Sequence, residues 1–256
     1  MNTHRAFSTK AEKYARYRWE YASRAIEAIF TTAGLSGDSI VADIGAGSGI
    51  LTRQFVGRVL RVIAVEPNLE MRREAEKRLP LSPSCLLVDG SGEHTGLAER
   101  SVDLITAAQA IHWMEGEAAR QEFLRILKPG GWLAILRNYP TRSDLNQAID
   151  EISTPENGVD DSTAPKQPAK QPPEFFYAAG SFQKLIYPFS YEQSWEEFFG
   201  ALISASFMPD EDHPLYPNLE RAARGVYSRF SSEGRLQGEG ATELYIGRPL
   251  GKMENE

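Results

Sequence analysis

The residues best suited to chemistry form one short stretch, Ile-Val-Ala-Asp-Ile-Gly-Ala-Gly-Ser-Gly over residues 40–49. Asp43 lies in an apolar run typical of a strand buried on both faces. The alternating glycines let a ligand approach the main chain closely. We expect a helix to open over residues 50–56 and to offer unpaired N–H groups. An acid before such a loop repels a pyrophosphate and attracts an ammonium group, which favours an amino-acid-bearing nucleoside.

The spacing of the glycines separates this loop from a dinucleotide fingerprint. That fingerprint, G-x-G-x-x-G, needs a third glycine where the chain has Ile50. The pattern G-x-G-x-G after Asp43 resembles the first motif of class I S-adenosylmethionine (SAM)-dependent methyltransferases, particularly the type 11 and trans-aconitate methyltransferase-like enzymes. The resemblance implies SAM as cofactor, S-adenosylhomocysteine as product, and Asp43, Gly45, Ala46 and Gly47 as cofactor residues. The alternative for the loop alone is a tight turn.

Two further acids end two expected strands. Residues 62–65 lead into Glu66, which can accept both hydroxyls of a ribose; the alternative is a carboxylate favouring the start of a helix over 68–79. Residues 84–88 lead into Asp89. The resemblance implies that Asp89 meets the amino group of adenine and that the next backbone N–H meets a ring nitrogen. It also brings further residues into the cofactor site, namely Pro67, Met71, Gly90 and Ser91.

A fourth apolar strand with small residues at its end is expected within residues 101–113, which close with Ala-Gln-Ala-Ile-His-Trp. This string resembles the fourth motif of the same family and adds Gln109 and Ala110 to the cofactor site. We expect His112 and Trp113 at the reaction site, with His112 toward the acceptor as a base or a positioning group. The alternatives are a structural hydrogen bond for His112 and core packing for Trp113. Leu-Lys-Pro-Gly-Gly before a strand at 132–136 is the family's usual approach to its fifth strand.

The ends of the chain are less specific. A helix pattern from Trp19 to Ala33 stops at Gly34. Before it, Tyr-x-x-Tyr-Arg resembles the segment that closes over the methionine end of SAM, with Tyr14 in contact and Arg18 paired to the cofactor carboxylate. The alternative is packing at a helix end. The basic run at 72–78 predicts a solvated helix face. The proline-rich segment 154–173 predicts a mobile loop that adds nothing to a core.

Composition narrows the classes of function. The chain has 256 residues, 41% hydrophobic content and a net charge of −7, which argues against a nucleic-acid partner. Cys85 is the only cysteine, and the four histidines lack metal-ligand spacing, so we expect no metal. The sequence shows neither a signal peptide nor a membrane span, which predicts a cytoplasmic protein without a membrane partner.

These patterns predict a doubly wound, Rossmann-like α/β fold with a seven-stranded sheet whose last strand is antiparallel. We expect a single domain over 1–256, with a core at about 35–137 and 236–250, an N-terminal cap at 1–34, and a helical lid at 138–235. Strands are expected at 182–188 and 242–247, and apolar helices at 195–207 and 219–230. The predicted activity is methylation of a small molecule at a carboxylate, hydroxyl or amine. A SAM-binding protein without transfer activity is the alternative, and an NAD-dependent dehydrogenase is disfavoured. The sequence leaves the acceptor and the oligomeric state open.

Overall fold

The computed structural model describes residues 10–160, 171–205 and 207–249, and the chain divides into two compact units. The glycine-loop unit comprises the described residues of 20–138, 167–187 and 242–256. The helical unit comprises those of 1–19, 139–166 and 188–241.

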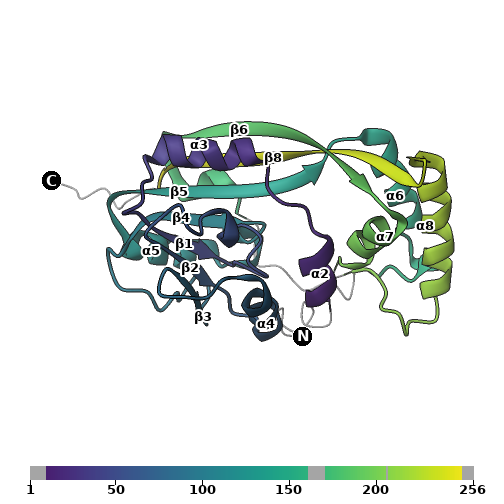
Figure 1. The fold of residues 1–256 in the computed structure, drawn as a ribbon, viewed down its shortest axis with the longest axis horizontal. Helices are drawn as coiled ribbons and strands as arrows, with labels where there is room; N and C mark the ends of the chain where they lie inside the picture. The colour runs from purple at the N-terminus through teal and green to yellow at the C-terminus, as the bar shows by residue number, and fades with distance from the viewer. Residues whose placement is uncertain (1–9, 161–170, 206, 250–256) are drawn as a thin grey trace. The chain divides into compact units, whose positions relative to one another are not determined.

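The sheet has the strand order β3-β2-β1-β4-β5-β8-β6, and a short β7 pairs with β8 (Figure 1). Strands β1 to β5 are parallel neighbours in that order. Parallel strands need crossover connections, and here helix α4 (Leu69–Arg78) connects β2 to β3 while α5 (Gly116–Ile126) connects β4 to β5. The strands are β1 Ile40–Ile44, β2 Arg61–Val65, β3 Cys85–Val88, β4 Val102–Ala108, β5 Leu127–Pro140, β6 Tyr177–Gln193, β7 Ser231–Ser232 and β8 Arg235–Pro249.

Strand β8 runs against its two neighbours. Arg248 of β8 contacts Gly130 near the start of β5, whereas Thr242 of β8 donates to Asn138 near the end of β5 at 2.6 Å. Residue numbers therefore fall along β8 as they rise along β5, which makes the two strands antiparallel. Along β6, Ser181 donates to the Arg248 carbonyl, and Lys184 pairs with Glu243 at 2.7 Å. The predicted antiparallel last strand is therefore confirmed.

Both faces of the sheet in the glycine-loop unit are covered. One face packs Val41, Leu104 and Leu136 against Ile26 and Ile29 of α3 (Ser23–Ala33). The same cluster includes Ala75 of α4 (Leu69–Arg78). The other face packs its strand residues against α5 (Gly116–Ile126). Strands that are buried on both faces have continuous apolar sequences, and this two-sided cover confirms the doubly wound fold.

The helical unit has a core of its own. Its helices are α2 (Ala11–Tyr17), α6 (Ser143–Ile152), α7 (Trp195–Ile203) and α8 (Tyr216–Phe230). The last three share one buried apolar cluster, which includes Phe198 and Leu219, so the apolar stripes of α7 and α8 are core as expected. Helix α2 packs on α7, where a Cβ at Gly200 would lie 2.4 Å from the Tyr17 ring. Among the described residues, no helix is long and apolar enough to cross a membrane.

Several local predictions need correction. Residues 50–56 do not open an α-helix; only a 3-10 turn, η1 (Thr52–Gln54), forms there. Helix α3 begins at Ser23, because the chain around Trp19 is extended, although Gly34 does end it with φ 64°. Helix α6 was not anticipated. The expected strands at 182–188 and 242–247 lie within the much longer β6 and β8.

The proline-rich segment is described only at its two ends, since 161–170 lie outside the described residues. Pro155–Asn157 forms the 3-10 turn η3, and Pro173–Phe176 forms η5. Val159 is 6% exposed within the core of the helical unit. The expectation that this segment adds nothing to a core is therefore wrong at Val159. Mobility of residues 161–170 stays a prediction.

Candidate cofactor site at the carboxyl edge of the sheet

The glycine loop follows β1 and is shaped by its neighbours. Gly45, Gly47 and Gly49 have φ of 69°, 57° and 83°, which side chains rarely allow. A Cβ at Gly45 would lie 2.6 Å from the Cβ of Ala110, and one at Gly49 would lie 2.8 Å from Leu79. A Cβ at Gly47 would meet no atom of the described residues within 4 Å. Gly45 and Gly49 thus serve packing, whereas the main chain at Gly47 borders open space that a ligand can enter.

Asp43 lies inside the protein beneath this loop. It is 1% exposed, and its carboxylate accepts hydrogen bonds from the hydroxyls of Thr52 at 2.6 Å and Thr106 at 2.9 Å. Burial raises the pKa of Asp43 to about 6, although these hydrogen bonds oppose the rise. The carboxylate therefore links η1, the turn after the glycine loop, to β4. Its attraction for an ammonium group stays a prediction.

Glu66 joins the end of β2 to the glycine loop. Its carboxylate accepts one hydrogen bond from the Gly47 N–H and one from the Asn68 N–H, both at 2.8 Å. The side chain of Asn68, not Glu66, caps α4 by accepting from the Met71 N–H at 3.0 Å. Burial raises the pKa of Glu66, opposed by the two N–H donors. Each carboxylate oxygen can still accept one further hydrogen bond, which a ribose hydroxyl can donate.

Asp89 follows β3, next to the end of β2, because the Glu66 N–H donates to the Val88 carbonyl at 3.1 Å. Its carboxylate forms a two-pronged ion pair with Arg72 of α4, at 2.8 and 2.9 Å. This contact corrects the prediction of a solvated helix face at Arg72, whose side chain is 15% exposed. Gly90 is required by packing, since a Cβ there would lie 2.8 Å from the Thr95 carbonyl oxygen.

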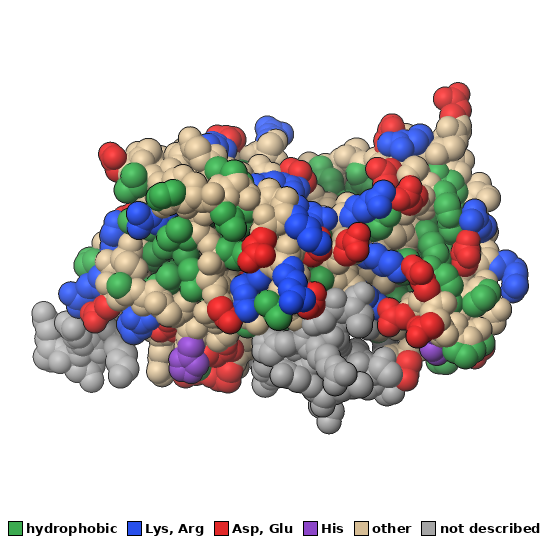
Figure 2. Space-filling view, turned by 60° about the horizontal axis from the view of Figure 1, so that its bottom comes forward, with side chains coloured by type: hydrophobic (Ala, Val, Ile, Leu, Met, Phe, Trp, Pro, Cys, Tyr) green, Lys and Arg blue, Asp and Glu red, His purple; other side chains and the backbone are tan. Residues whose placement is uncertain are grey.

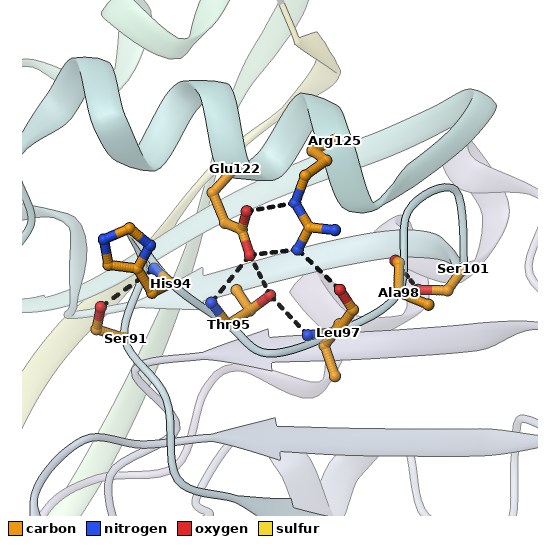
Figure 3. A network of polar contacts seen from close by, with 8 residues as sticks. All are labelled: Ser91, His94, Thr95, Leu97, Ala98, Ser101, Glu122 and Arg125. Carbon is orange, nitrogen blue, oxygen red and sulfur yellow. Dashed lines mark hydrogen bonds and ion pairs between the residues drawn. The ribbon is translucent and has the colours of Figure 1, made fainter.

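The loop after Asp89 is fastened to α5 by a polar network (Figure 3). Glu122 accepts from the Thr95 N–H at 2.9 Å and from Arg125 at 2.7 Å, and Arg125 also donates to the Leu97 carbonyl. Burial works against the charge of Glu122, but hydrogen bonds from Arg125 and Thr95 prevail and lower its pKa to about 2. Upstream, the Ser91 N–H donates to the His94 carbonyl at 3.0 Å. The loop beside the expected adenine site is therefore rigidly held.

The end of β4 turns sharply at Gln109, which has φ 53°. Its backbone N–H donates to the Leu136 carbonyl and its side chain to the Asn138 carbonyl, at 2.9 and 2.7 Å. A non-glycine residue held in this region is strained, and such strain concentrates at functional sites. The 3-10 turn η2 (Ile111–Trp113) follows and carries His112 and Trp113, whose ring centroids lie 5.0 Å apart at 48°. Their expected roles stay predictions.

The glycine-loop unit thus brings together the predicted residues that follow four adjacent strands, from Asp43 to His112. Pro67 follows Glu66 directly, Ala46 belongs to the glycine loop, and Met71 is buried in α4. Tyr14 and Arg18 belong to the helical unit, where the Arg18 guanidinium lies 5.0 Å from the centroid of the Tyr14 ring. Their contacts with a cofactor stay predictions. Within the described ranges, no group of three or more His, Cys, Asp and Glu side chains could hold a metal ion.

These residues fit an adenosine bearing an amino acid. Open space borders Gly47, and two carboxylates with spare acceptor sites end adjacent strands. A third, buried carboxylate lies under the loop, where a pyrophosphate would be repelled. The buried hydroxyl of Ser48 in the same loop has no hydrogen-bond partner in the described structure. The donor and acceptor set therefore suits SAM better than a dinucleotide.

Comparisons with known proteins also indicate a methyltransferase. Residues 42–135 match the family model described as a methyltransferase domain. An uncharacterized methyltransferase of Mycobacterium tuberculosis is 36% identical over 133 residues, 52% of each chain. The match thus spans about half the length of that relative. An uncharacterized methyltransferase-like protein of Schizosaccharomyces pombe is 29% identical over 229 residues, 87% of each chain.

Solved structures show the same fold. A proposed type II methyltransferase from Anaeromyxobacter dehalogenans superposes with a TM-score of 0.61 at 21% identity, over 91% of this chain and 98% of that one. A proposed methyltransferase of Haloferax volcanii, solved with the Trm112 methyltransferase activator, gives 0.53 at 16% identity, over 98% and 97%. These matches identify a methyltransferase domain over residues 42–135, and the fold is that of class I SAM-dependent methyltransferases. The finer resemblance to trans-aconitate methyltransferases stays a prediction.

Proposed function

We propose that this chain transfers a methyl group from SAM to a small-molecule acceptor. The observation that carries the proposal is the set of acids and glycines at the carboxyl ends of β1, β2 and β3, joined by the Glu66 to Gly47 hydrogen bond. In open α/β sheets, ligands bind at this edge. The match of residues 42–135 to a methyltransferase domain supports the same activity.

The residues have separable tasks in this proposal. When bound, SAM supplies a methyl group already activated by its sulfonium, so the protein must mainly align the reactants and exclude water. Glu66 holds the ribose, Asp89 and the Gly90 N–H hold the adenine, and Asp43 draws in the ammonium group. His112 lies beyond the cofactor residues in chain order and orients the acceptor or removes its proton. A carboxylate acceptor needs no base, whereas a hydroxyl or amine does.

A small acceptor fits the charge of the chain. A net charge of −7 opposes binding to a polyphosphate backbone. On the face shown in Figure 2, Lys and Arg side chains are interspersed with Asp and Glu instead of forming one continuous basic stripe. Both observations support a small molecule over nucleic acid as acceptor.

The activity is tested with the purified full chain. Calorimetry should show binding of SAM and S-adenosylhomocysteine but not of NAD. Incubation with SAM and a panel of carboxylates, phenols, alcohols and amines should release S-adenosylhomocysteine with one class of acceptor. Binding without any turnover would contradict the proposed enzyme and indicate a SAM-binding protein without transfer activity. Absence of SAM binding would contradict both.

The role of His112 has its own test. His112→Ala should lower turnover while leaving the SAM affinity within about twofold, because other residues hold the cofactor. Loss of a general base costs on the order of 10²-fold in kcat; loss of a positioning group appears mainly in the acceptor KM. His94→Ala is the matched control, since His94 is exposed and lies on the neighbouring loop. Full turnover by His112→Ala would leave His112 with a structural role only.

A further inference from the structure

Arg72 is the one cation that contacts both acid-bearing strand ends of the candidate site among the described residues. Its guanidinium donates three hydrogen bonds: to the Glu66 carbonyl at 2.8 Å, and to the two oxygens of Asp89 at 2.8 and 2.9 Å. The Arg72 side chain is 15% exposed, whereas that of Asp89 is 72% exposed. A partly buried guanidinium, fixed by three hydrogen bonds, thus holds an exposed carboxylate.

The position of Arg72 follows from the start of α4. Asn68 caps the helix, and the Arg72 N–H donates to the Asn68 carbonyl at 3.0 Å. Arg72 therefore lies one turn into the helix, and helical side chains point back toward the N-terminus. That direction leads to the ends of β2 and β3. The next residue, Arg73, instead pairs with Glu70 on the surface at 2.6 Å and is 57% exposed.

The fork of Arg72 sets the orientation of the Asp89 carboxylate. An exposed aspartate without a partner rotates among several rotamers, whereas two parallel N–H···O bonds fix the plane of its carboxylate. Each oxygen has about two acceptor sites, and Arg72 uses one on each. The remaining sites stay open to a further donor. The third hydrogen bond ties this arrangement to the main chain of Glu66, so the two acids keep a fixed separation.

We propose that Arg72 is a positioning residue that makes the site select adenine. The inference rests on the proposed binding of SAM. Arg72 holds Asp89 so that its free acceptor sites meet the 6-amino group of the base. A base with a carbonyl at that position would present an oxygen to the same carboxylate and be rejected. Sites built around a hydrogen-bond donor discriminate strongly against analogues that lack it.

The experiment compares two ligands by calorimetry: S-adenosylhomocysteine and S-inosylhomocysteine, in which the 6-amino group is replaced by a carbonyl. Wild-type protein should favour the adenosyl ligand. Arg72→Gln should weaken binding of the adenosyl ligand about tenfold, the effect of one charge-assisted contact. Binding of the inosyl ligand should change little, so that the preference falls by the same factor. Arg72→Lys keeps the charge but not the fork, and should lose the preference as well. Arg73→Gln should match wild type in both affinities.

The outcomes separate the two levels of the proposal. If wild type binds neither ligand, the proposed SAM site itself fails. If wild type binds but Arg72→Gln keeps the wild-type preference, Arg72 only stabilises the fold and the positioning role is wrong. If Arg72→Lys kept the full preference for the adenosyl ligand, a positive charge alone would suffice, and the proposed role of the two-pronged guanidinium would be wrong. Should Arg72→Gln not fold, as judged by circular dichroism, the lysine variant decides by the same ratio.

Discussion

The buried carboxylate of Asp43 should lower the stability of the unliganded protein. Removing its charge by the substitution Asp43→Asn should therefore raise the free energy of unfolding. Burial raises the pKa of Asp43 from 3.8 to about 6. The folded state therefore binds this proton more tightly than the unfolded state. The contribution of this carboxyl group to the free energy of unfolding is therefore most favourable below pH 3.8, and it is lost as the pH rises through about 6.

The size of the effect follows from that shift. A difference of about two pKa units corresponds to about 3 kcal/mol in favour of the neutral form at pH 7.5. Asparagine has the same shape, carries no charge, and can accept from one threonine while donating to the other. We therefore expect Asp43→Asn to raise the free energy of unfolding by about 1–3 kcal/mol at pH 7.5. The gain should shrink toward zero near pH 4.

Urea unfolding between pH 4 and pH 8 measures this change, with the exposed Asp38→Asn as the matched control. The same variant should bind S-adenosylhomocysteine about tenfold more weakly, because the charge that attracts the ammonium group is gone. Its affinity for 5′-methylthioadenosine, which lacks that group, should be unchanged. A variant that is less stable than wild type at pH 7.5, or whose advantage does not vary with pH, would refute the reasoning.

Two further predictions concern Glu66 and the helical unit. Glu66→Gln places an amide donor against a backbone N–H and removes the charge of the ribose acceptor proposed here. Because a charge-assisted hydrogen bond contributes about 1.5–3 kcal/mol, SAM binding measured by calorimetry should weaken about 10- to 100-fold. Unchanged affinity would exclude the ribose role. Gly200→Ala should lower the free energy of unfolding by about 1–3 kcal/mol in thermal or urea unfolding, because its Cβ would meet the Tyr17 ring. Gly225→Ala is its control: Gly225 lies in α8, the added Cβ would have no atom of the described part of the chain within 4 Å, and the change should stabilise by up to about 1 kcal/mol. Equal effects of the two alanines would contradict the close packing of α2 on α7.

The parallel half of the fold was predictable because its signals are local. The apolar run at 40–44 is β1 itself, and the acids Glu66 and Asp89 do follow β2 and β3. Alternation of apolar strands with helices is enough to specify the order of such elements. The stop of α3 at Gly34 was likewise visible, because a glycine there takes the left-handed conformation.

The parts that the sequence did not reveal depend on contacts between distant segments. Arg72 and Arg73 are neighbouring arginines that the sequence alone does not distinguish. Only the direction in which α4 points each side chain decides that Arg72 contacts Asp89. Thr52 and Thr106 are unremarkable hydroxyl residues until the fold places them on the two oxygens of Asp43. Val159 is the only aliphatic residue near the start of a polar segment, so its burial could not be inferred from composition. Side-chain partners of this kind require the three-dimensional arrangement.

The close approach of Gly45 to Ala110 sets a limit on protein engineering. With only 2.6 Å between the Cβ of Ala110 and a Cβ built at position 45, the two loops share one small volume. Any side chain larger than alanine at 110 would push on the glycine loop, and any side chain at 45 would push on the turn that carries His112. A library that varies the acceptor side of this domain should therefore hold positions 45 and 110 fixed and diversify beyond Trp113. Conversely, a paired change at both positions offers a way to shift the glycine loop and the turn η2 together.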